Sequence, residues 1–198
     1  MSLTSINISS LAIDNLCDRV ASGEKDLAVA WLYCDFLVHQ EQSATAMLGA
    51  ILRQLVGVGE MPENIRQMFR KRFSDRGLRL PDIVGMLKTT IALLPRVCIC
   101  IDALDESTPK SRQELLESLR GIVQEAPGAR VLFTGRPHVE EEVKKCFTKV
   151  ITVPVSPTEG DIRVYLSARL DRDTGPYAMD DDLRKDIMRI IPEMISEV

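Results

Sequence analysis

Short apolar runs alternate along this chain with segments of helical periodicity, and this alternation constrains the fold more than any other feature of the sequence. An apolar run covered on both faces is typical of a strand in a parallel sheet, because the crossover helices pack on both faces of such a sheet. We therefore predict an α/β fold with three layers, in which a mainly parallel sheet lies between helices. The predicted strands are 27–36, 97–101, 130–134 and 150–153.

Helices are predicted where apolar residues recur at spacings of three and four, and where proline or a capping residue precedes such a pattern. The polar stretch around Gly175 and Pro176 is typical of a hinge. We therefore expect residues 1–172 to form the α/β core and residues 173–198 to begin a C-terminal helical segment. The predicted helices are 11–20, 47–55, 62–73, 81–94, 111–126, 140–147, 156–170 and 180–192.

Composition excludes several classes of protein. Hydrophobic residues make up 45% and charged residues 27% of the 198 residues, which is typical of soluble globular domains. The net charge of −4 leaves no basic surface for nucleic acid, and no window of about 18 apolar residues predicts a membrane span. The five cysteines are odd in number and several lie in apolar runs, which favours free thiols in the cytoplasm.

The segment from Arg96 to Glu106 carries the most informative motif, in which an apolar strand ends in three acidic residues, Asp102, Asp105 and Glu106. Ligands of open α/β sheets bind at the carboxyl ends of the strands. A carboxylate there can hold hydrated Mg²⁺ against nucleotide phosphates, and a second can orient an attacking water. This is the Walker B pattern. The alternative is that Asp105 and Glu106 are only acidic residues at the start of the next helix.

Four segments, among them the acidic motif, occur in an order that resembles a known family: Tyr33 to Phe36, residues 40–55, Asp102 to Glu106 and Thr134 to Pro137. The chain resembles fungal NACHT domains, which belong to the STAND class of P-loop NTPases. The resemblance runs from about residue 9 to residue 198 and includes the stretch 161–173. It implies a fold of the P-loop NTPase type.

The resemblance also implies a function and roles for the acidic residues. The family's domains are nucleotide-controlled switches, often set between an effector region and repeats such as ankyrin repeats, in proteins linked to non-self recognition. By this resemblance Asp102 is the Walker B carboxylate that holds Mg²⁺ with ATP or GTP, through water. Asp105 and Glu106 are the acidic pair near the hydrolytic water.

Arg136 follows the strand at 130–134 and, by the same resemblance, matches the sensor arginine that reads the γ-phosphate. The alternative is an exposed loop arginine paired with Glu140 or Glu141. A right-handed crossover would place the strands ending near Asp102 and Arg136 side by side, so we expect both residues at the same edge of the sheet.

The sequence departs from the family at the phosphate-binding loop. Such a loop needs glycines followed by Lys and Ser or Thr, and none of the 11 glycines is followed by lysine. The family places this loop and its strand just before the helix predicted at 11–20. We therefore expect a sheet that is incomplete at its N-terminal strand. The segments 130–134 and 150–153 should not pair as ordinary neighbours, or should pair only through a rearrangement or a strand from another chain. The chain is then a fragment without its phosphate loop or a degenerate family member.

Three functions remain open. The first is the nucleotide-binding core of a STAND signalling protein, in which the full-length family hydrolyses nucleotide and this chain alone is inactive. The second is a non-catalytic interaction module that keeps the architecture, and the third is a magnesium-dependent hydrolase without a P-loop. The expected partners are other domains of the same polypeptide, namely an effector region and repeats, and a second copy through self-association. Nucleic acid and membrane are not expected partners.

Overall fold

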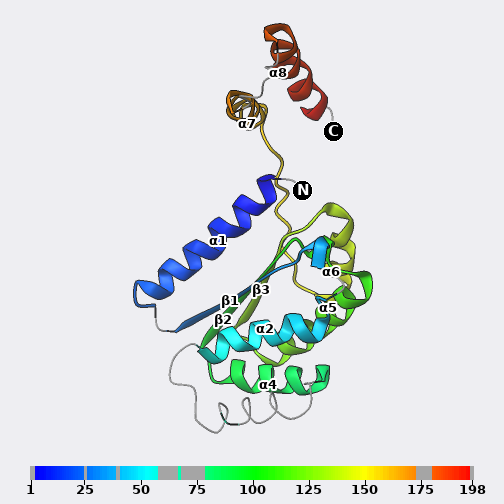
Figure 1. The fold of residues 1–198 in the computed structure, drawn as a ribbon. Coiled ribbons are helices and arrows are strands. Elements are labelled where there is room, and N and C mark those ends of the chain that lie inside the picture. The colour runs from blue at the N-terminus through cyan, green and yellow to red at the C-terminus, as the bar shows by residue number, and fades with distance from the viewer. Residues whose placement is uncertain are drawn as a thin grey trace. The chain divides into compact units, whose positions relative to one another are not determined.

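Three parallel strands form the sheet in the order β1-β2-β3 (Figure 1). They are β1 (Leu27–Tyr33), β2 (Arg96–Asp102) and β3 (Ala129–Phe133). Tyr33 lies beside Asp102, and Ile101 lies beside Phe133. The prediction of an α/β fold with a parallel sheet is confirmed.

The computed structural model describes residues 3–24, 26–38, 41–57, 67, 79–172 and 180–196. These form two compact units, Met1–Ile151 and Thr152–Val198. The sheet and its helices belong to the first unit. The predicted helix at 62–73 lies outside the described residues except for one position, and the predicted hinge at Gly175 and Pro176 also lies outside them.

Helices cover both faces of the sheet, as Figure 1 shows. On one side lies α1 (Leu3–Ala21), which packs on β1 and β2 and is longer than predicted. On the other side α2 (Ala44–Gly57) packs on β1, and α5 (Pro109–Glu125) packs on β3. A further helix, α4 (Leu80–Ala92), packs against both α2 and α5. The three predicted layers are therefore present.

The main core lies between the sheet and the layer of α2, α4 and α5. Alternate residues of each strand point to one face of a sheet, and in β2 the residues Ile99 and Ile101 point into this core. The helices meet them with leucines at helical spacing, among which Leu48, Leu115 and Leu119 are fully buried. The apolar runs seen in the sequence thus become strands because this face is shielded from water.

Short elements complete the first unit at the carboxyl edge of the sheet. Strand β1 ends earlier than predicted and leads into η1 (Phe36–Val38). Strand β2 leads into η2 (Leu104–Glu106), and β3 leads into η3 (Pro137–Val139) and α6 (Glu140–Cys146). These turns place the candidate site.

The predicted strand at 150–153 is wrong, because the structure has no strand there. Ile151 and Val153 are mostly exposed, and no neighbouring strand offers them a hydrogen-bonding partner. The expectation about the pairing of 130–134 with 150–153 concerned two strands, so the structure does not test it.

The second unit contains α7 (Glu159–Asp171) and α8 (Asp181–Ser196), which pack against each other. Arg163 joins them by donating from Nη1 to the Met188 carbonyl at 3.0 Å. The division between the two compact units falls at Ile151 and Thr152. The sequence analysis expects a domain boundary after residue 172, which would separate α7 from α8. This boundary stays a prediction.

Candidate functional site

The carboxyl edge of the sheet brings together the four predicted site residues, Asp102, Asp105, Glu106 and Arg136. Asp102 is the last residue of β2 and is 3% exposed. Arg136 lies just beyond β3, the parallel neighbour of β2. The prediction that Asp102 and Arg136 lie at the same edge is confirmed. The site therefore has the location that ligands favour in α/β sheets.

Asp102 is held by Thr134, a residue whose role the sequence analysis missed. The Thr134 hydroxyl donates to Asp102 Oδ1 and accepts from the backbone N–H of Ala103, the latter at 3.1 Å. The backbone carbonyl of Asp102 accepts from the Cys34 N–H at 3.0 Å. These bonds fix the orientation of a carboxylate that is almost wholly withdrawn from water.

Asp105 is bound to Arg136, so two predicted site residues are partners of each other. Asp105 Oδ1 accepts from the Arg136 backbone N–H at 3.2 Å, and Asp105 Oδ2 lies 3.3 Å from Arg136 Nε. The Asp105 side chain is 9% exposed and that of Arg136 is 63% exposed. Gly135 permits this approach, because a Cβ there would lie 3.0 Å from the Val139 side chain and 3.3 Å from Asp105 Oδ1.

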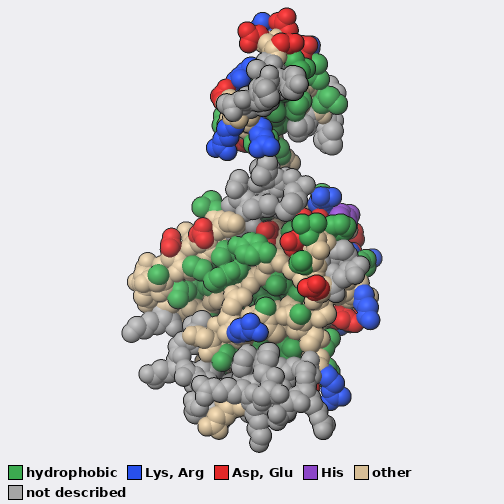
Figure 2. Space-filling model, in the orientation of Figure 1, with side chains coloured by type: hydrophobic (Ala, Val, Ile, Leu, Met, Phe, Trp, Pro, Cys, Tyr) green, Lys and Arg blue, Asp and Glu red, His purple; other side chains and the backbone are tan. Residues whose placement is uncertain are grey.

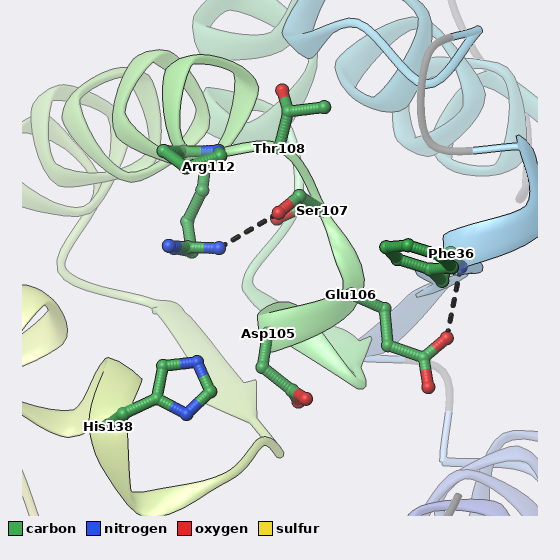
Figure 3. Close-up of a pocket in the computed structure, with 8 residues that line it drawn as sticks. Phe36, Asp105, Glu106, Ser107, Thr108, Arg112 and His138 are labelled. Atoms are coloured by element: carbon green, nitrogen blue, oxygen red, sulfur yellow. Dashed lines mark hydrogen bonds between the residues drawn. The ribbon is translucent and has the colours of Figure 1, made fainter.

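Glu106 points toward the loop after β1. Its Oε2 accepts from the Phe36 N–H at 3.0 Å, which ties η1 to η2 (Figure 3). Asp105 and Glu106 lie in the first turn of the short 3-10 helix η2, and α5 begins only at Pro109, so the alternative that they are acidic residues at a helix start keeps its place beside the functional one. Each acidic residue of the motif therefore has a partner within the chain.

A pocket of about 320 Å³ lies beside η2, where side chains from η1, η3 and the start of α5 meet (Figure 3). His138 and Phe36 line it together with Arg112, which lies on α5 and is 6% exposed. Arg112 donates to both carboxylate oxygens of Glu142, at 2.8 and 3.0 Å, and to the Ser107 carbonyl at 2.9 Å. The sequence analysis did not single out Arg112, because a lone arginine in a polar helix carries no signal of burial.

Negative charge dominates the electrostatics of this edge. Burial raises the pKa of the Cys34 thiol to about 12, and the charges of Asp102, Asp105 and Glu106 act in the same direction. Cys34 is therefore a protonated thiol at neutral pH and not a nucleophile. The hydrogen bond from Arg112 holds the pKa of Glu142 below its usual range.

A nucleotide site needs carboxylates that hold Mg²⁺ and a glycine-rich loop that binds the phosphates. The residues of this edge include the carboxylates but not the loop. No cluster of three or more histidine, cysteine or acidic residues that could hold a metal ion occurs in the described part of the chain. Mg²⁺ bound with a nucleotide needs only one or two carboxylates, because phosphates and water supply the other ligands. Asp102 is a carboxylate of this kind at a strand end, 3% exposed and hydrogen-bonded to Thr134, whereas no glycine is followed by the lysine of a phosphate-binding loop.

Backbone strain accompanies the motif at Ala103, directly after Asp102. Ala103 has φ of 53° and is in the left-handed region, which costs a residue with a Cβ about 1 kcal/mol. This conformation turns the chain from β2 into η2 and thereby aims Asp102 and Asp105 at the same edge.

Ala103→Gly is therefore expected to raise the free energy of unfolding by about 0.5–1 kcal/mol, measured by urea denaturation, since glycine adopts this conformation without strain. The matched control is Ala46→Gly on the exposed surface of α2, where glycine should destabilise by a similar amount. A loss of stability in both variants would contradict the assignment of strain to Ala103.

Comparison with known families bears on the same part of the chain. Residues 7–136 match the family described as Nephrocystin 3, N-terminal. The chain belongs to this family. The matched nephrocystin 3 N-terminal region spans all three strands and ends at Arg136, so the four predicted site residues lie within it. No NACHT family matched, and the resemblance to NACHT domains of the STAND class remains a hypothesis.

Searches of the curated proteins and of the solved structures gave no significant match. In the ranges that the structure describes, no helix has both the length and the apolar character needed to cross a membrane.

Proposed function

We propose that this chain is the nucleotide-binding module of a cytoplasmic switch protein of the NACHT and STAND type, which takes Mg²⁺ with ATP or GTP. The observation that carries the proposal is the gathering of Asp102, Asp105, Glu106 and Arg136 at the carboxyl edge of a parallel sheet. A chance run of acidic residues would not be expected to combine a buried carboxylate at a strand end, a fixed hydrogen-bonding partner for it and an arginine just beyond the neighbouring strand.

Asp102 is the residue that would hold the metal ion. Its Oδ1 accepts from Thr134, so the carboxylate presents a fixed orientation at the strand end. Mg²⁺ bound with the nucleotide supplies charge neutralisation of the phosphates. Burial of Asp102 in a low-dielectric edge strengthens its attraction for any cation that reaches it.

Arg136 and Asp105 form the part of the site that would respond to the nucleotide. Their ion pair neutralises both charges, and the Arg136 side chain is 63% exposed whereas that of Asp105 is 9% exposed. The exposed guanidinium can turn toward an anionic group, while Asp105 keeps the hydrogen bond from the Arg136 N–H. Glu106, which is bound to the Phe36 N–H, keeps the loop after β1 beside the same edge.

The phosphate side requires a glycine-rich loop with lysine from polypeptide outside this sequence. Loop N–H groups, a helix N-terminus and the loop lysine make most phosphate contacts in such sites. Without them three carboxylates repel a triphosphate. Titration calorimetry of the 198-residue chain should therefore show no saturable binding of Mg-ATP or Mg-GTP up to about 1 mM, since about 4 kcal/mol of binding free energy corresponds to that limit.

The positive test uses a longer polypeptide that adds the upstream strand and glycine-rich loop, if the gene encodes them. It should bind Mg-ATP or Mg-GTP at least about 100-fold more tightly, and Asp102→Asn should abolish most of that gain. The matched control is Asp14→Asn, which removes an exposed carboxylate from α1. Micromolar binding by the 198-residue chain would overturn the account of the missing loop.

Failure of the longer polypeptide to bind either nucleotide would overturn the proposed function. It would favour the second candidate, a non-catalytic module that contacts other domains of its polypeptide, such as an effector region or repeats. The observation that favours this candidate is that Asp102, Asp105 and Glu106 are each satisfied by partners within the chain.

A further inference from the structure

Three consecutive apolar residues are exposed in η1, directly after β1. Phe36 is 64% exposed, Leu37 is 88% exposed and Val38 is 43% exposed, and together they form the η1 surface. Single exposed apolar residues are common on proteins, whereas an uninterrupted exposed run is typical of a contact site. Phe36 also lines the pocket beside η2 (Figure 3). The η1 surface is therefore a candidate site for binding a partner.

Hydrogen bonds fix the backbone that carries the η1 surface. Each N–H group from residue 35 to residue 38 donates a hydrogen bond within the chain. The N–H of Phe36 donates to Glu106 at 3.0 Å, and the N–H of Leu37 donates to the Asp35 carboxylate at 2.9 Å. The exposed side chains are thus presented from a set conformation, so a partner would bind at little cost in ordering the loop.

The exposure of η1 does not depend on the strand of the phosphate-binding loop. That strand would lie beside β3, whereas η1 follows β1 at the opposite edge of the sheet. The β1 edge is itself closed, because the Gln54 side chain accepts from the Trp31 N–H at 2.9 Å and donates to the Trp31 carbonyl at 2.7 Å. A partner of η1 therefore binds through side chains and not by adding a strand to β1.

Acidic side chains border the η1 surface. Asp35 and Glu41 flank it in the sequence, and Glu106 accepts from the Phe36 N–H. Figure 2 shows hydrophobic and acidic side chains next to one another in this part of the surface. No lysine or arginine occurs between residues 26 and 52, and the arginines of the candidate site are paired with other carboxylates. Within the described residues these three carboxylates form no ion pair, so the complementary charge can come from a partner.

We propose that the η1 surface binds a basic amphipathic helix that lies outside this sequence. Apolar side chains on one face of that helix contact the three exposed side chains of η1, as in other complexes that a helix forms through its apolar face. Lysine or arginine side chains at the border of the same face lie beside Asp35, Glu41 and Glu106. The interaction goes beyond the proposed nucleotide binding and does not require it.

A synthetic peptide of leucine and lysine, with its leucines on one helical face, is the probe for this site. It has about 20 residues, which is long enough for a helix to form in water. Titration followed by ¹H–¹⁵N NMR should shift the amide signals of residues 35–38, with a dissociation constant of about 10–100 μM, because the contact is small. The same peptide with glutamate in place of lysine should bind at least about 10-fold more weakly, because like charges then meet.

Two substitutions of exposed residues test the apolar and the charged part of the contact. Leu37→Ser should weaken binding of the leucine–lysine peptide about 10-fold, and Glu41→Lys should weaken it about fivefold at low salt. The matched control is Leu93→Ser at the C-terminal end of α4, where the leucine is 51% exposed and the affinity should not change. Far-UV circular dichroism verifies the fold of each variant.

Several results would overturn the proposal. Equal affinity for the two peptides would indicate apolar adhesion without recognition of charge. Equal weakening by Leu37→Ser and Leu93→Ser, or amide shifts confined to residues outside 33–42, would place the contact elsewhere. A mass of twice 22.1 kDa in light scattering that Leu37→Ser returns to 22.1 kDa would make a second copy the occupant. These experiments contain no nucleotide, so this proposal and the proposed function fail separately.

Discussion

Gly128→Ala is expected to lower the free energy of unfolding by about 3 kcal/mol, which is at the upper end of the cost of overpacking. Gly128 lies in the turn before β3, and its carbonyl accepts from the Val97 N–H at 3.1 Å. A Cβ at this position would lie 2.4 Å from the carbonyl oxygen of Pro95. Both partners in this clash are backbone, so the start of β2 and the start of β3 would have to move apart.

The matched control is Gly85→Ala, the same substitution in the middle of α4. No atom lies within 4 Å of a Cβ built there, and alanine is the better helix former. Gly85→Ala should therefore raise the free energy of unfolding by about 0.5–1 kcal/mol. Urea denaturation measures both, and stabilities within 0.5 kcal/mol of each other, about the error of such a comparison, would show that the β2 and β3 turns do not constrain Gly128.

Arg112→Met is expected to cost about 2–3 kcal/mol of unfolding free energy, because it leaves buried hydrogen-bonding groups without a partner. The Arg112 guanidinium binds both oxygens of Glu142 and the Ser107 carbonyl, and so joins α5, α6 and the turn after η2. Methionine fills much of the same space without a charge. The cost stays below that of a fully buried pair because the Glu142 side chain is 39% exposed and regains water.

Arg120→Met, an exposed position of α5, is the matched control and should change stability by less than about 0.5 kcal/mol. A double-mutant cycle with Glu142→Gln then isolates the pair energy. Additive effects of the two substitutions would contradict a coupled pair.

The same pair predicts a dependence on pH with a definite sign. The hydrogen bond from Arg112 lowers the pKa of Glu142 in the folded chain, below the value of about 4.3 for an unfolded glutamate. The stabilisation is thus fully present above pH of about 4.3 and is lost as the pH falls through the folded pKa. The stability difference between wild type and Arg112→Met should therefore shrink in acid.

Much of the fold follows from local patterns in the sequence. The apolar run 97–101 becomes β2 because periodicity and β-branching favour a buried strand there, and the leucines of α5 recur at helical spacing. The same local patterns predicted a strand at 150–153, where the structure has none. A strand needs hydrogen-bonding partners that its own residues do not supply, so strand propensity alone could not decide this case.

Part of the candidate site likewise follows from local patterns in the sequence. That an acidic motif follows one strand and Arg136 follows the next is a property of the sequence, and the right-handed crossover rule was enough to place Asp102 and Arg136 at one edge. The sequence also shows that none of its glycines is followed by lysine. These features depend on residue order along the chain, which is visible without coordinates.

Only the tertiary structure decided which partners these residues take. The left-handed turn at Ala103 directs Asp105 to Arg136 and Glu106 to the Phe36 N–H, and packing of α5 against α6 buries Arg112 beside Glu142. Such pairings depend on distances of a few ångströms between segments far apart in sequence. Hydrogen bonds weaken steeply beyond that range, so residue types and spacings along the chain could name the members of the site but not their partners.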